Sequence, residues 1–245
     1  MPPDTRGDLG TILGVWAHPD DEAYLSAGLM ALAVDAGRRV VCVTATAGEA
    51  GFPDHDTRPH EARIAVRRAE MAASLAEIGV REHHWLGYRD GECAAVSDVE
   101  AVATICDIIA NAQPDTLLTF GPAGMTGHSD HVAVCRWSTL ACAQLSPPPR
   151  LLYATKSPEW THQFFGQADT SQIMMVDGMV PEAVPTDDMA VWFDCDGDLL
   201  DRKLRALRAQ HSQIEPLISS FGLDWFRYFV RHECFRQPRP SDPVW

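Results

Sequence analysis

The sequence predicts an α/β protein with a Rossmann-like three-layer fold, a mostly parallel sheet and a C-terminal lobe. In the first half, short apolar runs rich in β-branched residues alternate with longer amphipathic segments. The Pro-rich stretch 146-SPPPR-150 marks a change, after which the order of elements is less regular. Because strands that alternate with helices connect through right-handed crossovers, we expect helices on both faces of the sheet.

The elements follow in order along the chain. The strands are expected at 12–17, 39–45, 83–87, 115–121, 150–155, 171–177 and 190–195. The helices are expected at 23–37, 60–79, 98–112, 130–144, 198–214 and 223–231. Gly37 and Gly79 end the first two helices, and Ser97 or Asp98 caps the third. We treat residues 1–245 as one domain, with a core over 1–145 and a lobe over 146–245 that shapes the pocket.

Composition restricts the partners and the compartment. The 245 residues carry a net charge of -14, which argues against nucleic acid and anionic membranes as partners. Seven cysteines, an odd number without a C-x-x-C pair, lie partly in apolar runs, which favours reduced thiols and a cytoplasmic location. No apolar run approaches the roughly 18 residues of a membrane span. A homo-oligomer is left open.

Two clusters of metal-ligand residue types follow two of the expected strands. The stretch 18-HPDDE-22 comes after the first strand, and 121-GPAGMTGHSDH-131 comes after the fourth. In a doubly wound sheet of order 3-2-1-4-5 these strands are neighbours, and the chain leaves them in opposite directions. Ligands bind in the crevice at that point. The two clusters are therefore expected to meet in one crevice.

The residue types suggest how a metal would be held. His18 and Asp21 are three residues apart, so one turn of chain brings both side chains to one side. With His131 they offer two imidazoles and a carboxylate, a set that suits zinc and leaves a position open for water. Iron(II) is left open as the native metal. Asp20 is then the candidate base for the water, and Glu22 a supporting hydrogen-bond partner.

Each cluster alone also fits a purely structural role. The three acids of 18-HPDDE-22 could favour the N-terminus of the helix that follows, and His128 and Asp130 could cap another helix. Their coincidence at neighbouring strand ends is what favours a metal site. The sequence lacks G-x-S-x-G and has no G-x-G-x-x-G after the first strand, so a serine hydrolase or a dinucleotide site lacks support.

These motifs resemble those of the LmbE / PIG-L family of zinc-dependent N-deacetylases. A-H-P-D-D-E after the first strand and G-H-x-D-H after the fourth carry the resemblance. The segments 44-TATAGEAG-51, 67-RRAEMAASLAEIGV-80 and 203-KLRALRAQHSQ-213 extend it over most of the chain. His211 and Gln213 match a family helix near the site without an assigned role. The family includes deacetylases of mycothiol and bacillithiol biosynthesis and the enzyme that acts on N-acetylglucosaminyl phosphatidylinositol.

The resemblance implies an activity and agrees with the proposed ligands. His18, Asp21 and His131 match the zinc ligands, and Asp20 matches the general base. The implied reaction is zinc-dependent hydrolysis of the N-acetyl group of an N-acetylglucosaminyl-type conjugate, which releases acetate and a free amine. The expected partner is thus a small-molecule amino-sugar conjugate.

The resemblance also assigns roles to four further residues. His128 matches a histidine that stabilises the tetrahedral intermediate, and Asp130 matches the aspartate that orients it. Arg67 matches an arginine implicated in substrate binding, and Glu49 lies in the segment that lines the sugar pocket. One position departs from the mycothiol-type members, because Thr126 stands where they carry a tyrosine.

Two alternative functions remain open at this stage. One is a metal-dependent amidase that acts on a larger thiol- or antibiotic-like conjugate, which the released acid would distinguish. The other is a catalytically silent metal- or sugar-binding homologue. The presence of both Asp20 and His128 argues against the silent protein, since binding alone needs neither residue.

Overall fold

A seven-stranded sheet forms the centre of the computed structural model, which describes residues 8–165, 176 and 178–245. The strand order is β3-β2-β1-β4-β5-β7-β6. The strands are β1 (Ile12–Trp16), β2 (Val40–Thr46), β3 (Glu82–Tyr88), β4 (Thr116–Thr119), β5 (Arg150–Thr155), β6 (Val191–Asp194) and β7 (His232–Arg236). Five strands pair in parallel, and β7 runs antiparallel to β5 and β6. The predicted fold class and the neighbouring positions of β1 and β4 are confirmed.

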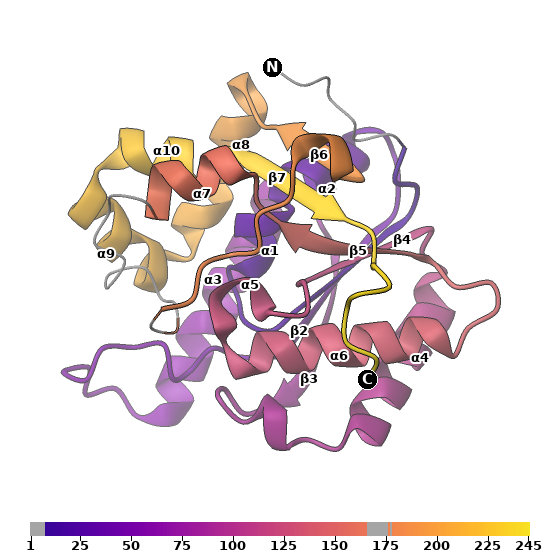
Figure 1. The fold of residues 1–245 in the computed structure, drawn as a ribbon. Helices are drawn as coiled ribbons and strands as arrows, with labels where there is room; N and C mark the ends of the chain where they lie inside the picture. The colour runs from indigo at the N-terminus through magenta and orange to yellow at the C-terminus, as the bar shows by residue number, and fades with distance from the viewer. Residues whose placement is uncertain (1–7, 166–175, 177) are drawn as a thin grey trace.

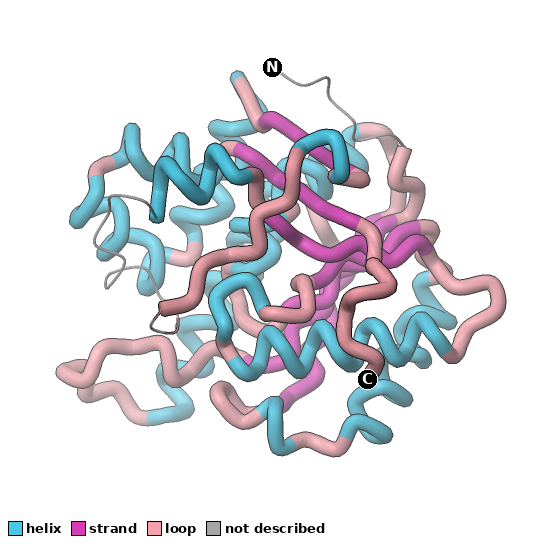
Figure 2. Tube along the Cα trace, in the orientation of Figure 1, coloured by secondary structure: helices cyan, strands magenta, loops and turns pink. Residues whose placement is uncertain are grey.

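Helices cover both faces of this sheet (Figures 1 and 2). They are α1 (Asp21–Leu25), α2 (Ala27–Asp35), α3 (His60–Ile78), α4 (Asp98–Ala112), α5 (Gly124–Gly127), α6 (Ser129–Ala143), α7 (Pro158–Phe165), α8 (Gly197–Ala209), α9 (His211–Phe221) and α10 (Leu223–Val230). Short 3-10 turns lie at Cys93–Ala95 and Thr186–Asp188. Helices α2, α3 and α8 contact one another, and α4 contacts α6. Right-handed crossovers place these two groups on opposite faces.

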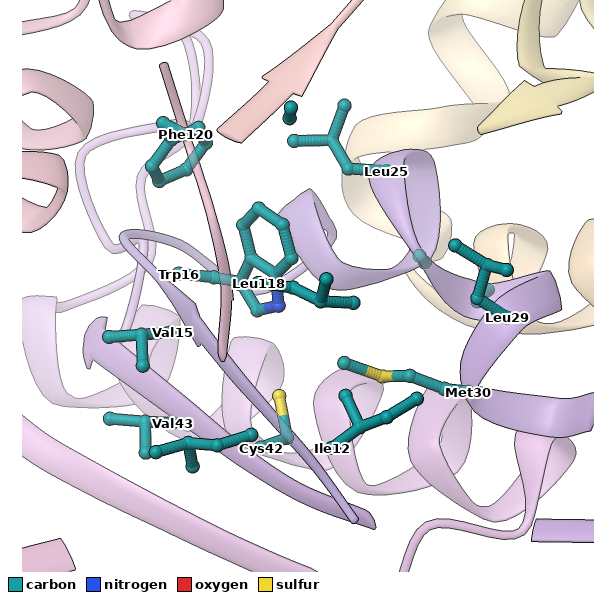
Figure 3. Packing of buried hydrophobic residues seen from close by; sticks show 14 of the residues in the cluster. Ile12, Val15, Trp16, Leu25, Leu29, Met30, Cys42, Val43, Leu118 and Phe120 are labelled. Carbon is teal, nitrogen blue, oxygen red and sulfur yellow. The ribbon is translucent and has the colours of Figure 1, made fainter. Parts of the chain in front are cut away.

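Strands β1 and β2 appear in the sequence as apolar runs because both of their faces are covered by other elements. Every residue of β1 and of β2 is buried. Figure 3 shows Val15 and Val43 on one side of the central strands and Trp16, Leu118 and Met30 on the other. The register places Gly14 beside both Cys42 and Leu118. This rigid centre holds the carboxyl ends of β1 and β4 side by side, where the chain turns toward the two ligand clusters.

Two predicted helices are each divided in the structure. The helix expected at 23–37 is split between α1 and α2 at Ser26, whose φ is -148° and whose hydroxyl donates to the Glu22 carbonyl. The helix expected at 198–214 is split between α8 and α9 at Gln210. Gln210 is fully buried, and its amide donates to the Glu22 carboxylate. The residue at each break therefore contacts Glu22. The helical periodicity of the sequence does not indicate either contact.

Strand β7 and helix α7 were not predicted. Strand β7 has no continuous apolar pattern in the sequence, because two buried charged residues, Glu233 and Arg236, interrupt it. Glu233 pairs with Lys203 at 2.7 Å, and Arg236 pairs with Glu182 and Asp242. Of the strand expected at 171–177, only Val176 is described, and it lies outside any helix or strand; the other residues fall outside the described part of the chain.

The second half of the chain continues the same sheet through β5, β7 and β6. The division into a core and a pocket-shaping lobe stays a prediction. All seven cysteines are free thiols, and all but Cys106 are buried. None of the helices in the described ranges is long and apolar enough to cross a membrane. The cytoplasmic location stays a prediction.

Candidate functional site

The turn that follows β1 is shaped by its own acidic side chains. Asp20 adopts a left-handed backbone conformation, with φ of 100°, which a short polar side chain tolerates better than most. Asp21 Oδ2 accepts the His18 backbone N–H at 2.8 Å, and Glu22 Oε2 accepts the Asp20 N–H at 3.0 Å. Glu22 also accepts the Ser74 hydroxyl. The turn therefore fixes the directions of His18, Asp20 and Asp21.

Three ligand residues from the two clusters meet at one point. His18 Nδ1 lies 3.0 Å from His131 Nε2 and 3.6 Å from Asp21 Oδ2. His131 Nε2 lies 3.5 Å from Asp21 Oδ1. Metal–nitrogen and metal–oxygen bonds of about 2.0–2.1 Å in a tetrahedron place ligand atoms about 3.3 Å apart. The spacing of the two nitrogens and the Asp21 carboxylate fits a zinc-sized ion.

The outer nitrogens of both imidazoles are hydrogen-bonded to oxygens, and the inner nitrogens face each other at 3.0 Å. His131 Nδ1 lies 2.8 Å from the Gly124 carbonyl and 3.1 Å from Thr126 Oγ1. His18 Nε2 lies 3.0 Å from Asp90 Oδ1 and 3.3 Å from Asp130 Oδ2. An imidazole that donates its outer N–H to an oxygen presents a lone pair at the inner nitrogen, as metal ligands do. The hydrogen bonding therefore fits a metal at these residues.

The pKa values of the two imidazoles are shifted in opposite directions. Burial disfavours the charged form of His18, but its hydrogen bonds to Asp130 and Asp90 and the charge of Asp21 raise its pKa to about 10. Burial and the neighbouring charge of His18 lower the pKa of His131 well below its usual range. A metal ion that bound here would replace the His18 proton, because ligation needs the neutral ring.

Asp20 lies beside the ligands and faces a buried arginine. Burial raises the pKa of Asp20 to about 7, although the positive charge of Arg67 opposes this shift. Arg67 is 1% exposed, donates to Asp20 Oδ2 at 3.2 Å and also donates to the Pro19 carbonyl. Arg67 thus holds the turn that carries Asp20, while its side chain also lines the cavity.

His128 and Asp130 lie at the start of α6, where His128 also acts as the cap that a structural role predicts. His128 is the N-cap residue, and its Nδ1 accepts the Asp130 backbone N–H at 3.2 Å. The Asp130 carboxylate is fully buried and accepts the backbone N–H groups of Gly91 and Cys93. Its Oδ2 also lies 3.3 Å from His18 Nε2. Asp130 therefore touches His128 through its backbone and supports His18 through its side chain, a contact that the sequence did not indicate.

Glu49 differs from its two neighbours in the cavity that it borders. It borders a separate cavity of about 220 Å³, whereas Gly48 and Ala50 on either side of it line the large cavity. Its Oε1 accepts the Asp90 backbone N–H at 3.0 Å. Its side chain therefore holds the turn that carries Asp90, and the substrate contact expected of Glu49 stays a prediction.

Asp90 is the residue of the site that the sequence interpretation missed. Its carboxylate contacts His18 and also accepts the Ala50 backbone N–H at 2.8 Å. It follows β3 in the stretch 88-YRDGE-92, and an acidic residue beside a glycine just after a strand is the signal that could have revealed it. Gln213 lines the large cavity, whereas His211 is exposed and does not.

A cavity of about 830 Å³ encloses the site. His18, Asp20, Asp21, His128 and His131 line it, and so do side chains from α7, α9 and α10. Beside the set of His18, Asp21 and His131, two further groups of ligand-type atoms cluster among the described residues, and both include His18. One joins it to His128 and His131, and the other joins it to Asp90 and Asp130. The ligand cluster therefore opens into a space large enough for a sugar conjugate.

Comparisons with known proteins agree with the motifs. The family model for GlcNAc-PI de-N-acetylase, PIG-L, matches residues 13–142. A 1D-myo-inositol 2-acetamido-2-deoxy-alpha-D-glucopyranoside deacetylase from Acidothermus cellulolyticus is 31% identical over 233 residues, which cover 83% of this chain and 80% of that protein. A deacetylase of the same name from Catenulispora acidiphila is 29% identical, with 96% of this chain and 86% of the relative covered.

Solved structures show the same fold at lower sequence identity. The N,N'-diacetylchitobiose deacetylase from Pyrococcus horikoshii has a TM-score of 0.63 and 23% identity, over 94% of this chain and 84% of that one. The A40926 pseudoaglycone deacetylase has a TM-score of 0.66 and 21% identity, over 94% and 97%. The predicted resemblance is confirmed by the family match over residues 13–142. The chain belongs to the PIG-L family, whose members include the enzymes that remove acetyl groups from amino sugars.

Proposed function

We propose that this protein is a metal-dependent hydrolase that removes the N-acetyl group from an N-acetylglucosaminyl-type conjugate. The observation that carries the proposal is the convergence of His18 Nδ1, Asp21 and His131 Nε2, all within 3.6 Å of one another, beside Asp20 in the large cavity. The names of the related proteins support an acetylated amino sugar as substrate. One water is consumed, and acetate and a free amine are produced.

His18, Asp21 and His131 would hold the metal. When bound, zinc supplies Lewis acidity to a water and to the amide carbonyl. The remaining steps depend on side chains of this chain. Asp130 and Asp90 orient His18, and the Gly124 carbonyl orients His131, so the ligand set is held in place before a metal arrives.

Asp20 is the proposed base. Its raised pKa, about 7, matches a group that accepts the proton of the attacking water near neutrality. A C–O bond forms at the amide carbon as that proton moves to Asp20. Arg67 acts as a positioning residue, because its hydrogen bonds to Asp20 and to the Pro19 carbonyl fix the base.

His128 is the proposed donor to the reacting amide. Its Nδ1 accepts the Asp130 N–H, so the neutral ring carries its proton on Nε2. That N–H can stabilise the negative charge that develops on the carbonyl oxygen. When the C–N bond breaks, the departing nitrogen takes a proton from His128 or from the protonated Asp20. The products leave as acetate and an amine.

Acetate release from a panel of N-acetylglucosaminyl conjugates tests the proposal. The protein is first stripped with a chelator and then reloaded with zinc. We expect acetate and a free amine from at least one member after reloading, and none from the stripped protein. Release of a larger acid from an acyl-extended substrate, without acetate from any N-acetyl compound, would favour the amidase. Turnover that is unchanged by stripping would contradict metal dependence.

A further inference from the structure

One part of the large cavity is built from apolar side chains. Helices α7, α9 and α10 lie side by side in Figure 1, and the rings of α7 and α10 are in direct contact. Together with the end of α1 they contribute an apolar wall, which consists of Tyr24, Leu25, Trp160, Leu217, Phe229 and Val230. The ligand cluster comes instead from the turns that follow β1 and β4.

Ring contacts hold the apolar wall in a fixed shape. The Trp160 ring lies 5.1 Å from the Phe229 ring and 5.2 Å from the Phe164 ring. Trp225 stacks on Phe229 at 4.8 Å. The Trp160 indole N–H donates to the Phe229 carbonyl at 2.9 Å. Because this donor is already engaged, Trp160 offers the cavity only carbon surface.

Polar groups near the apolar wall are also engaged. Lys156 lines the cavity, but its ammonium donates to the His232 carbonyl at 3.1 Å and lies 4.8 Å from the centre of the Trp160 ring. The Ser212 hydroxyl donates to Glu70 at 2.7 Å, and the Ser220 hydroxyl donates to the Pro216 carbonyl at 3.0 Å. These three described groups are therefore not free to bind the hydroxyl groups of a ligand.

We propose that the aglycone of the substrate is apolar, either aromatic or alkyl, and that it lies against the apolar wall. This inference rests on the proposed function, which places the N-acetyl group at the ligand cluster. A polyol aglycone such as inositol would lose hydrogen bonds to water that Lys156, Ser212 and Ser220 do not replace, and this loss disfavours binding. An apolar aglycone would gain by leaving water, and it would meet a wall that is already ordered. The relatives from Acidothermus cellulolyticus and Catenulispora acidiphila are named for an inositol conjugate, so this chain would differ from them in specificity.

Three N-acetylglucosaminides with different aglycones test the inference: methyl, phenyl and myo-inositol. The zinc-loaded protein is assayed for acetate release, and binding to the protein as isolated is measured by calorimetry. We expect kcat/KM and affinity for the phenyl compound to exceed those for the inositol compound by about tenfold or more. A tenfold ratio corresponds to a small free-energy difference, which the burial of apolar surface can supply. An inositol compound that matches or exceeds the phenyl compound would overturn the inference.

Variants on α9 and α10 test whether the apolar wall causes the preference for an apolar aglycone. Leu217→Asn alters the apolar wall, and we expect the ratio of phenyl to methyl kcat/KM to fall about fivefold, as for the loss of part of one apolar contact. Leu217→Met should keep that ratio. Leu223→Asn is the matched control, because Leu223 is 42% exposed and does not line the cavity. An equal fall in both asparagine variants, or in neither, would contradict the assignment of the wall.

The two proposals can fail separately. If the phenyl compound binds at least tenfold more tightly than the inositol compound but no acetate appears, hydrolysis is wrong and the apolar site stands. If acetate is released fastest from the inositol compound, hydrolysis stands and the apolar aglycone is wrong.

Discussion

The carboxylate of Asp130 lies 3.3 Å from His18 Nε2, on the side of that ring away from His131. Asp130 is fully buried, and the backbone N–H groups of Gly91 and Cys93 fix its two oxygens. The second sequence cluster therefore contributes twice to the candidate metal centre. It provides His131 as a ligand, and through Asp130 it orients the ligand that the first cluster provides.

Asp130→Asn should weaken metal binding without unfolding the protein. The amide keeps the shape of the side chain but removes the negative charge that orients His18 and raises its basicity. We expect zinc affinity, measured by competition with a chelating dye, to fall about 10- to 100-fold. Asp107→Asn, on the exposed side of α4, is the control. Equal zinc affinities in the two variants would exclude Asp130 as a supporting residue.

The buried pair of Lys203 and Glu233 should be essential to stability. Both side chains are fully buried at 2.7 Å, and Glu233 also accepts the backbone N–H groups of Gly28 and Leu29. Glu233→Ala would leave the Lys203 charge without its counter-ion and two N–H groups without partners. We expect the free energy of unfolding in urea to fall by about 3–5 kcal/mol.

Glu77→Ala supplies the comparison for that experiment. Glu77 pairs with Arg205 at 2.9 Å, but both side chains are exposed to solvent. An exposed pair contributes about 1 kcal/mol or less. If the two alanine variants lost similar stability, the view that Glu233 joins β7 and α8 to the start of α2 would be wrong.

Lys156 should make the free energy of unfolding rise with pH. Burial lowers the pKa of Lys156 from 10.5 to about 8, with the charges of Lys203 and Glu233 acting in opposite directions. Between these values the unfolded chain binds more protons at Lys156 than the folded chain, so this group makes stability rise with pH. Relative to Lys156→Met, the wild type should gain up to about 3 kcal/mol of unfolding free energy between pH 8 and 10.5.

Urea unfolding of both proteins at these two pH values checks the prediction. Other titrating groups, including the cysteines, are common to both proteins and cancel in the difference. A difference that stays constant with pH, or that falls, would mean that Lys156 is not held as a desolvated ammonium in the folded state.

The sequence predicted the parts of the fold that depend on local pattern. β1 and β2 are buried on both faces and so appear as unbroken apolar runs, and the order of strands and helices determines the parallel sheet. The ends of β1 and β4 then meet for topological reasons. The position of the ligand cluster followed from these two facts together with the residue types.

The features that were missed depend on contacts between distant residues. Strand β7 carries Glu233, which is neutralised by a lysine 30 positions away in the chain. Asp90 reaches His18 only because Ala50 and Glu49 hold its turn. Neither contact leaves a periodic signal in its own segment. For Glu49, family resemblance located the segment correctly but did not reveal that its side chain faces the smaller cavity.

Adjacent substitutions at Asp20 and Asp21 test the central claim most directly. Asp20→Asn and Asp21→Asn are each loaded with zinc, and both metal content and acetate release are measured. The account predicts that Asp20→Asn keeps about one zinc per chain but loses about 10²–10⁴-fold in kcat, as expected for a removed base. It predicts that Asp21→Asn loses most of its zinc. Full zinc in Asp21→Asn, or near-normal acetate release from Asp20→Asn, would contradict the assignment of ligand and base.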